Sequence, residues 1–181
     1  SIVSSGSDAG KTLNELVIKY KASLLGEENY KRFGHHFPLL VKFIDARDDL
    51  SVQVHPNDQL AKVRHQSVGK TEMWYIIDNN NGKGHLCPGF KKKITSNEFT
   101  SLIKEDKISD VLANYAVQSG DVFYLPAGRI HSIGAGCFLV EIQQTSNITY
   151  RIYDYNRTDK NGNHRELHTE LAHKAIDYQT E

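Results

Sequence analysis

Cysteine is scarce in this sequence, because its 181 residues include only Cys87 and Cys137. Two cysteines so far apart in the chain provide neither a disulfide framework nor a thiolate zinc cluster. Disulfides are not needed for stability, since 39% hydrophobic residues provide enough apolar material for a core at this length. We therefore expect both thiols to be reduced, as they are in the cytoplasm.

An excess of charge of one sign and a long apolar run are also missing. The 22 Lys and Arg residues balance 22 Asp and Glu residues. Without a large basic field, no binding to nucleic acid or to an anionic membrane is expected. The longest apolar stretch, residues 37–44, contains Lys42 and is far shorter than the roughly 20 residues of a spanning helix. The first residues also lack the charged and apolar regions of a secretion signal. These absences predict a cytoplasmic protein.

Short strand-like segments dominate the hydrophobic pattern. They alternate with glycine- and proline-containing turns, which favours an antiparallel barrel or sandwich and a mainly β protein. A buried strand is predicted over residues 38–44 and a further strand from His85. The other strands are expected over residues 50–56, 72–77, 115–117, 122–125, 132–133, 138–143 and 149–153.

Helices are expected at only a few places. Apolar residues spaced by three and four predict a helix over 12–25, which a polar connection joins to the first strand. A short helical stretch is expected from Pro56 through residue 64. Thr95 and Glu98 form a capping box for a helix through residue 104. With a second short helix over 108–114, it forms a helical insertion near 95–114. We expect residues 1–181 to form one domain.

Candidate metal ligands lie on two of these segments. Gln53 and His55 are two residues apart on a strand, so both side chains project from the same face. Residues 120–131 follow the spacing G-x5-P-x-G-x2-H, which resembles the second sequence motif of the cupin superfamily and aims His131 inward; the alternative is a hairpin whose histidine caps a turn. Glu72 adds a carboxylate, and two imidazoles with one carboxylate suit zinc, although iron or manganese also fits.

Four sequence blocks carry a closer resemblance. They are SVQVHPND over 51–58, KTEMWY over 70–75, LPAGRIH over 125–131 and TYRIYD over 149–154. Together they resemble type I mannose-6-phosphate isomerase in its compact bacterial form, over roughly residues 9–168. The resemblance implies a cupin-type double-stranded β-helix, or jelly-roll barrel. It also implies one zinc ion per chain and the interconversion of mannose 6-phosphate and fructose 6-phosphate.

The same resemblance implies roles for individual residues. The zinc ligands would be Gln53, His55, Glu72 and His131. A sugar-phosphate pocket would be lined by Lys42, Ser51, Lys70 and Arg151. The catalytic candidates are Arg151, Glu141 and Lys70. The family also carries an earlier segment and further strands that are absent here, so we expect this chain to be part of a longer protein.

The reaction leaves several alternatives open. An enediolate must be stabilised while a proton moves between neighbouring carbons. The candidates for the base that transfers this proton are Glu141, Lys70 and a zinc-bound water. Arg151 can clamp the phosphate or steady the enediolate. Strand aromatics such as Trp74 form a sugar-stacking wall or belong to the core. The competing functions are another metal-dependent cupin enzyme and a non-catalytic sugar-phosphate sensor. No oligomeric state is predicted.

Overall fold

The computed structural model describes residues 1–179 and divides into two compact units, Ser1–Leu39 and Leu40–Glu181. The first unit contains three short helices, α1 (Leu13–Tyr20), α2 (Ala22–Leu25) and α3 (Glu27–Phe33). The single helix predicted over 12–25 is wrong in one respect, because it breaks at Lys21, where φ is 50°. The prediction of a plain polar connection is also wrong, since α3 lies within it. This helix has no buried residue, so it lacks the apolar periodicity that predicts helices.

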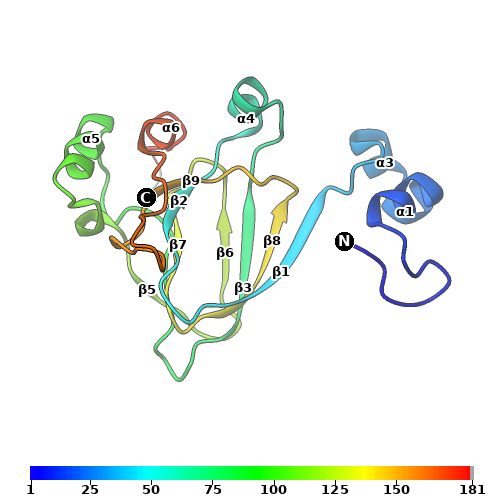
Figure 1. Ribbon diagram of the computed structural model, residues 1–181, viewed down its shortest axis with the longest axis horizontal. Coiled ribbons are helices and arrows are strands. Elements are labelled where there is room, and N and C mark those ends of the chain that lie inside the picture. Colours follow the sequence, from blue (N-terminus) through cyan, green and yellow to red (C-terminus); the bar gives the residue numbers. More distant parts are fainter. Residues whose placement is uncertain (180–181) are drawn as a thin grey trace. The chain divides into compact units, whose positions relative to one another are not determined.

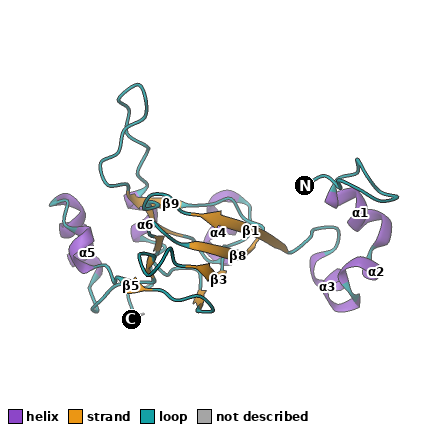
Figure 2. Ribbon diagram, turned by 90° about the horizontal axis from the view of Figure 1, so that it is seen from below, coloured by secondary structure: helices purple, strands orange, loops and turns teal. Residues whose placement is uncertain are grey.

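The second unit is built on a four-stranded sheet. Its strands are β1 (Leu39–Asp45), β8 (Phe138–Gln144), β3 (Glu72–Asp78) and β6 (Val122–Leu125), in the order β1-β8-β3-β6 (Figures 1 and 2). The register places Trp74 of β3 opposite Glu141 of β8, and Glu72 opposite Gln143. Because directly paired residues share a face, these four side chains project from the same face of the sheet.

Five shorter strands form a second layer. β2 (Val52–Val54) pairs with β9 (Tyr150–Tyr153), and β4 (His85–Cys87) lies between β5 (Tyr115–Ala116) and β7 (Ser132–Ile133). A bridge between Gln53 and His131 links these two groups of strands. The sequence-based prediction of a mainly β protein is therefore confirmed, and the bridge places the predicted ligands Gln53 and His131 where these two groups of strands meet.

Helices of the second unit flank the β2–β9 pair. They are α4 (Asp58–His65), α5 (Ser96–Lys104), the 3-10 helix η1 (Ile108–Val111) and α6 (Thr169–His173). The predicted capping box of Thr95 and Glu98 begins α5. The insertion between β4 and β5 is as expected, but the helix predicted over 108–114 is a single 3-10 turn. None of the helices in residues 1–179 combines the length and the apolar character that crossing a lipid bilayer requires.

Two apolar clusters hold this unit together. One includes Trp74, Ile76, Leu86, Ile133 and Leu139, and so joins the four-stranded sheet to the β4–β7 strands. The other packs β2 and β9 against α5, η1 and α6, with members such as Val54, Phe99, Ile108, Ile152 and Ala172. The strands that carry the candidate ligands therefore each contribute to one of the two clusters.

The prediction that 38–44 is a buried strand is wrong. β1 is an edge strand whose side chains alternate, and Val41 and Phe43 are 54% and 71% exposed. Apolar side chains continue across the same face of the sheet at Tyr75 and Tyr124, which are also exposed. Lys42 occupies the opposite face, together with Glu141 and Gln143. A continuous apolar run thus marks a strand with two different faces, one of which carries a charged side chain.

Candidate metal centre and substrate pocket

Three potential metal ligands converge between the two layers of strands. Glu72 begins β3, His55 directly follows β2, and His131 directly precedes β7. Each side chain is at most 2% exposed. One ligand atom from each residue lies within 4.8 Å of the others. The structure therefore brings together residues that are far apart in the sequence.

Backbone contacts fix the two histidines. The N–H of Gln53 donates to the carbonyl of His131, and the N–H of His131 donates back to Gln53, both at 2.9 Å. The N–H of Gly128 donates to the carbonyl of His55 at 2.8 Å. Gly128 has φ of 92°, a conformation that glycine adopts without strain. The Pro-x-Gly turn predicted from the sequence thus aims His131 at the centre.

The hydrogen bonds of the imidazole rings leave their Nε2 atoms facing Glu72. His55 Nδ1–H donates to the carbonyl of Ile148, and His131 Nδ1–H donates to the carbonyl of Arg129, each at 2.9 Å. His55 Nε2 is buried and has no hydrogen-bond partner in the described part of the chain. It lies 3.4 Å from one oxygen of Glu72, and His131 Nε2 lies 3.5 Å from the other. Metal-binding histidines usually have such an outer hydrogen bond, so the donor set fits a cation.

The amide of Gln53 reaches the same point. Its nitrogen lies 3.3 Å from His131 Nε2. Two imidazoles, one carboxylate and one amide can therefore surround a single ion. This arrangement agrees with the four ligands expected from the sequence, whose individual roles stay predictions.

Protonation states at the centre favour cation binding. Burial lowers the pKa of His55 to about 4, and burial also lowers the pKa of His131. Burial alone would raise the pKa of Glu72, but contacts with His55, His131 and Lys70 lower it overall. Neutral imidazoles and an ionised carboxylate are the forms that bind a metal, so no proton has to be displaced near pH 7.

Lys70 lies beside this centre. Its Nζ atom is 2.8 Å from Glu72, and the lysine side chain is 7% exposed. The turn that places it depends on Gly69, where an added Cβ would come within 2.6 Å of the backbone of Asn57 and Asp58. Lysine is rarely buried without a partner, and here the partner is a predicted metal ligand.

A second group of polar side chains surrounds the buried Glu141. Lys42 donates to Glu141 at 2.8 Å and also contacts Gln143. The indole N–H of Trp74 donates to the other oxygen of Glu141 at 3.1 Å. Glu141 is 4% exposed, so these two donors hold a carboxylate that has little contact with water. Trp74 itself is fully buried, which places it in the core rather than in a stacking wall.

Arg151 extends the polar site along β9. It pairs with Gln53 across the β2–β9 ladder. Its Nε donates to Ser51 Oγ at 3.4 Å, and its Nη1 donates to the carbonyl of Glu166 at 2.9 Å. Burial lowers the pKa of Arg151, but the guanidinium stays charged at neutral pH. The Arg151 guanidinium is therefore a fixed cation near the centre, because Arg151 pairs with Gln53, which in turn pairs with His131.

Comparisons with known proteins identify the family of this chain. The family model described as "Phosphomannose isomerase type I, catalytic domain" matches residues 2–110. Mannose-6-phosphate isomerase ManA of Bacillus subtilis is 41% identical over 98% of this chain and 54% of its own length. The chain belongs to the type I phosphomannose isomerase family.

Solved structures of type I phosphomannose isomerases share the fold of this chain. The crystal structure of the mannose 6-phosphate isomerase from Bacillus subtilis matches with a TM-score of 0.88 and 35% identity, over 99% of this chain and 55% of that chain. A zinc-bound mannose 6-phosphate isomerase shares the fold, with a TM-score of 0.72 at 14% identity, over 96% of this chain and 62% of that chain. The predicted cupin fold is thereby confirmed. The chain spans about half the length of the curated relatives it matches.

Residues that the sequence did not single out also help to shape the candidate site. Gln143 contacts Lys42, and it lies two residues from Glu141 on the same strand face. Strand alternation alone could have found it. The carbonyl of Glu166, by contrast, gives no sequence signal, because only the return of the chain towards β9 brings it to Arg151.

Proposed function

We propose that the protein is a zinc-dependent mannose-6-phosphate isomerase, which interconverts this aldose with the ketose fructose 6-phosphate. The observation that carries the proposal is the buried group of His55, Glu72 and His131, in which the Nε2 atom of His55 has no hydrogen-bond partner among the described residues. An unpaired buried nitrogen is costly unless a ligand satisfies it. Family membership supplies the substrate class.

His55, Glu72, His131 and Gln53 would hold one zinc ion per chain. Two imidazoles, a carboxylate and an amide are ligand types that zinc accepts in fourfold coordination. When bound, the ion acts as a Lewis acid that stabilises negative charge on substrate oxygens. The neutral amide of Gln53, in place of a second carboxylate, leaves the centre with net positive charge.

The proton is moved by side chains next to this centre. The isomerisation requires removal of a proton beside the carbonyl and its return to the neighbouring carbon. Glu141 and Lys70, both buried, are the side-chain candidates for this task. Glu141 already accepts hydrogen bonds from Trp74 and Lys42, which fix the orientation of its carboxylate. Lys70 is held by Glu72.

The substrate phosphate would bind to Lys42, Ser51, Lys70 and Arg151. Binding energy at this non-reacting group orients the sugar without taking part in proton transfer. Arg151 suits the task because its guanidinium presents several donors in a fixed plane. Both cysteines are free thiols and buried, which supports the cytoplasm as the location. The assignment of residues 1–181 to one catalytic domain of a longer protein stays a prediction.

A coupled assay tests the proposal. Conversion of mannose 6-phosphate to fructose 6-phosphate by the full-length protein should disappear on chelation and return with zinc. His131→Gln should lose both zinc and activity, whereas His36→Gln, at an exposed position, should lose neither. Saturable substrate binding without conversion by the zinc-loaded full-length protein would instead indicate a sugar-phosphate sensor.

A further inference from the structure

We propose that Asp154 is a positioning residue for Arg151, and that it acts by clamping both ends of the loop that follows β9. The inference deepens the proposed function and rests on it for the role of Arg151. Neither the family resemblance nor the metal centre assigns a role to Asp154. The loop, residues 155–165, is called here the β9 loop.

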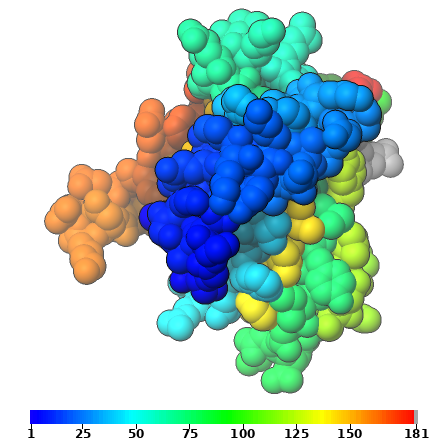
Figure 3. All heavy atoms as spheres, turned by 90° about the vertical axis from the view of Figure 1, so that its right-hand side faces the viewer, coloured from blue at the N-terminus to red at the C-terminus, as the bar shows by residue number. Residues whose placement is uncertain are grey.

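The β9 loop leaves the strand through an unusual turn. Tyr155 and Asn156 are consecutive non-glycine residues with φ of 56° and 54°. This left-handed conformation costs free energy for residues with a Cβ atom, so surrounding contacts must hold it. The loop then turns at Asp159, whose carboxylate accepts the N–H groups of Asn161 and Asn163. Figure 3 shows the loop in orange as a projection from the second unit.

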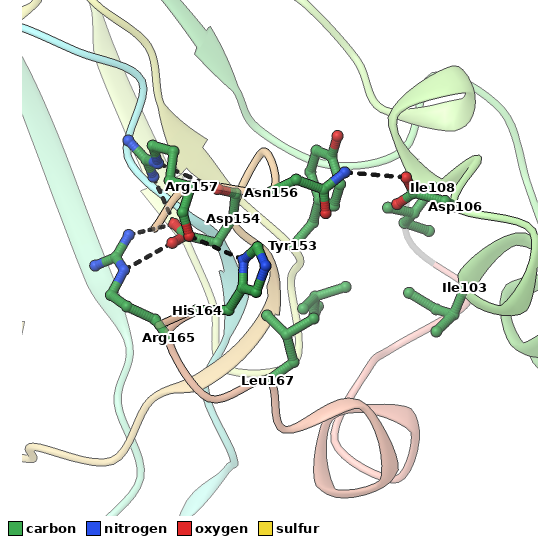
Figure 4. A pocket seen from close by; sticks show the side chains of 11 residues that line it. Ile103, Asp106, Ile108, Tyr153, Asp154, Asn156, Arg157, His164, Arg165 and Leu167 are labelled. Carbon is green, nitrogen blue, oxygen red and sulfur yellow. Dashed lines mark hydrogen bonds and ion pairs between the residues drawn. The ribbon is translucent and has the colours of Figure 1, made fainter. Parts of the chain in front are cut away.

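A single buried carboxylate joins the two limbs of this loop. Asp154 is 5% exposed. From the outgoing limb, Arg157 Nη2 donates to its Oδ1 at 2.5 Å. From the returning limb, Arg165 Nε donates to its Oδ2 at 2.8 Å, and Arg165 Nη2 donates to Oδ1. Figure 4 shows both guanidinium groups converging on the carboxylate. Charge-assisted contacts of this kind are the stronger class of hydrogen bond.

The returning limb contacts Arg151 immediately after the clamp. Glu166 follows Arg165 in the chain, and its carbonyl accepts a hydrogen bond from Arg151 Nη1 at 2.9 Å. Two residues later, the N–H of His168 donates to the carbonyl of Arg151 at 2.7 Å, and the N–H of Arg151 donates to His168 Nδ1 at 3.2 Å. The position of the limb therefore sets the position of the guanidinium.

The outgoing limb is connected to Arg151 indirectly, through the segment that contains Asp49 and Ser51. Arg157 Nη1 donates to the carbonyl of Asp49 at 2.5 Å. Asp49 lies two residues before Ser51, whose hydroxyl accepts a hydrogen bond from Arg151 Nε. Asp154 is thus connected through Arg157 to the segment of Ser51, and through Arg165 to Glu166. Ser51 and Glu166 are the two residues that accept hydrogen bonds from the Arg151 guanidinium.

Charge adds to this mechanical connection. Arg151, Arg157 and Arg165 lie close enough to act on one another electrostatically. The Asp154 carboxylate stands between Arg157 and Arg165 and offsets part of their charge. Without it, the two arginines would repel each other and Arg151, and the returning limb would lose its attachment. Displacing a substrate-binding group by about 1 Å can reduce the rate about 100-fold.

The test uses Asp154→Asn in the full-length, zinc-loaded protein. We expect kcat/KM for mannose 6-phosphate to fall about 10- to 100-fold with unchanged zinc content. The Arg151 Nε–H signal in a nitrogen-edited NMR spectrum, assigned with Arg151→Lys, should exchange faster with water than in the wild type. Asp159→Asn is the matched control, because it makes the same change in the same loop at a carboxylate that caps backbone amides. It should leave kcat/KM within about twofold of the wild type.

A second variant keeps the inference falsifiable if Asp154→Asn does not fold. Arg165→Lys keeps a cation but loses the fork that binds Asp154, so it should show the same changes in a milder form. Unchanged exchange of the Arg151 signal in a folded variant would overturn the inference, whatever the activity. If the wild type binds zinc but does not isomerise the sugar, the proposed function fails, and the exchange measurement still decides whether Asp154 holds Arg151.

Discussion

The buried ion pair of Lys70 and Glu72 allows a quantitative prediction for Lys70→Met. The two side chains are 7% and 0% exposed, and Nζ lies 2.8 Å from the carboxylate. Methionine has a similar length and keeps most of the packing, but it leaves the Glu72 carboxylate without its cation. Removing one partner of a buried pair costs about 3–5 kcal/mol. In chelated protein, the free energy of unfolding should therefore fall by about 3 kcal/mol.

Bound zinc should reduce this loss. A dication held by Glu72 would replace Lys70 as the compensating charge, so in zinc-loaded protein the same substitution should cost about 1 kcal/mol. For a chain of this size, 1 kcal/mol corresponds to about 2–4 °C in Tm. The expected loss is thus about 6–12 °C in chelated protein and about 2–4 °C in zinc-loaded protein.

Urea unfolding and thermal melts of this 181-residue chain, each with chelator and with zinc, measure the two losses. Lys93→Met changes an exposed lysine in the same way, and it should stay within about 0.5 kcal/mol of the wild type in both conditions. An equal loss in chelated and zinc-loaded protein would show that zinc and Lys70 do not share the Glu72 carboxylate. No loss in chelated protein would show that the ion pair does not stabilise the fold.

Three further outcomes follow from the structure. Arg151→Ala should lower kcat/KM by about 100-fold or more while zinc content stays unchanged, and equal loss of both would contradict its placement in the substrate pocket. Burial alone would raise the pKa of Asp154, but hydrogen bonds from Arg165 and Arg157 lower it below its ordinary value of 3.8. The stability advantage of the wild type over Asp154→Asn should therefore be complete above about pH 5 and shrink as the pH falls below 3.8, which urea titrations across this range would measure. Gly69→Ala should cost more than about 2 kcal/mol, because its Cβ would meet backbone atoms at 2.6 Å, whereas Gly82→Ala, with φ of 83° and open space around it, should cost about 1 kcal/mol in the same denaturation assay.

Local patterns in the sequence predicted much of the β scaffold, and together with the family resemblance they predicted the central residues. Alternation in Gln53–His55 and the Pro-x-Gly turn before His131 depend only on nearby residues, so they were readable without coordinates. The capping box of α5 was equally local. Predictions failed where local signals were weak or ambiguous. α3 has no buried residue, and the apolar run of β1 hid a strand with one exposed face.

Long-range pairing decided the remaining features of the site. Nothing near Lys70 in the sequence shows that its ammonium is buried, because burial depends on the more distant segments that pack around it; the ion pair with Glu72, only two residues away, compensates the buried charge. Glu141 likewise acquires its partners from β1 and β3. The network from Asp154 to Arg151 depends on a loop that returns to β9, and chain reversal of this kind leaves no periodic pattern. The sequence by itself predicted which residues would carry the chemistry, whereas the tertiary structure decided which of them touch, because contact depends on how distant segments pack.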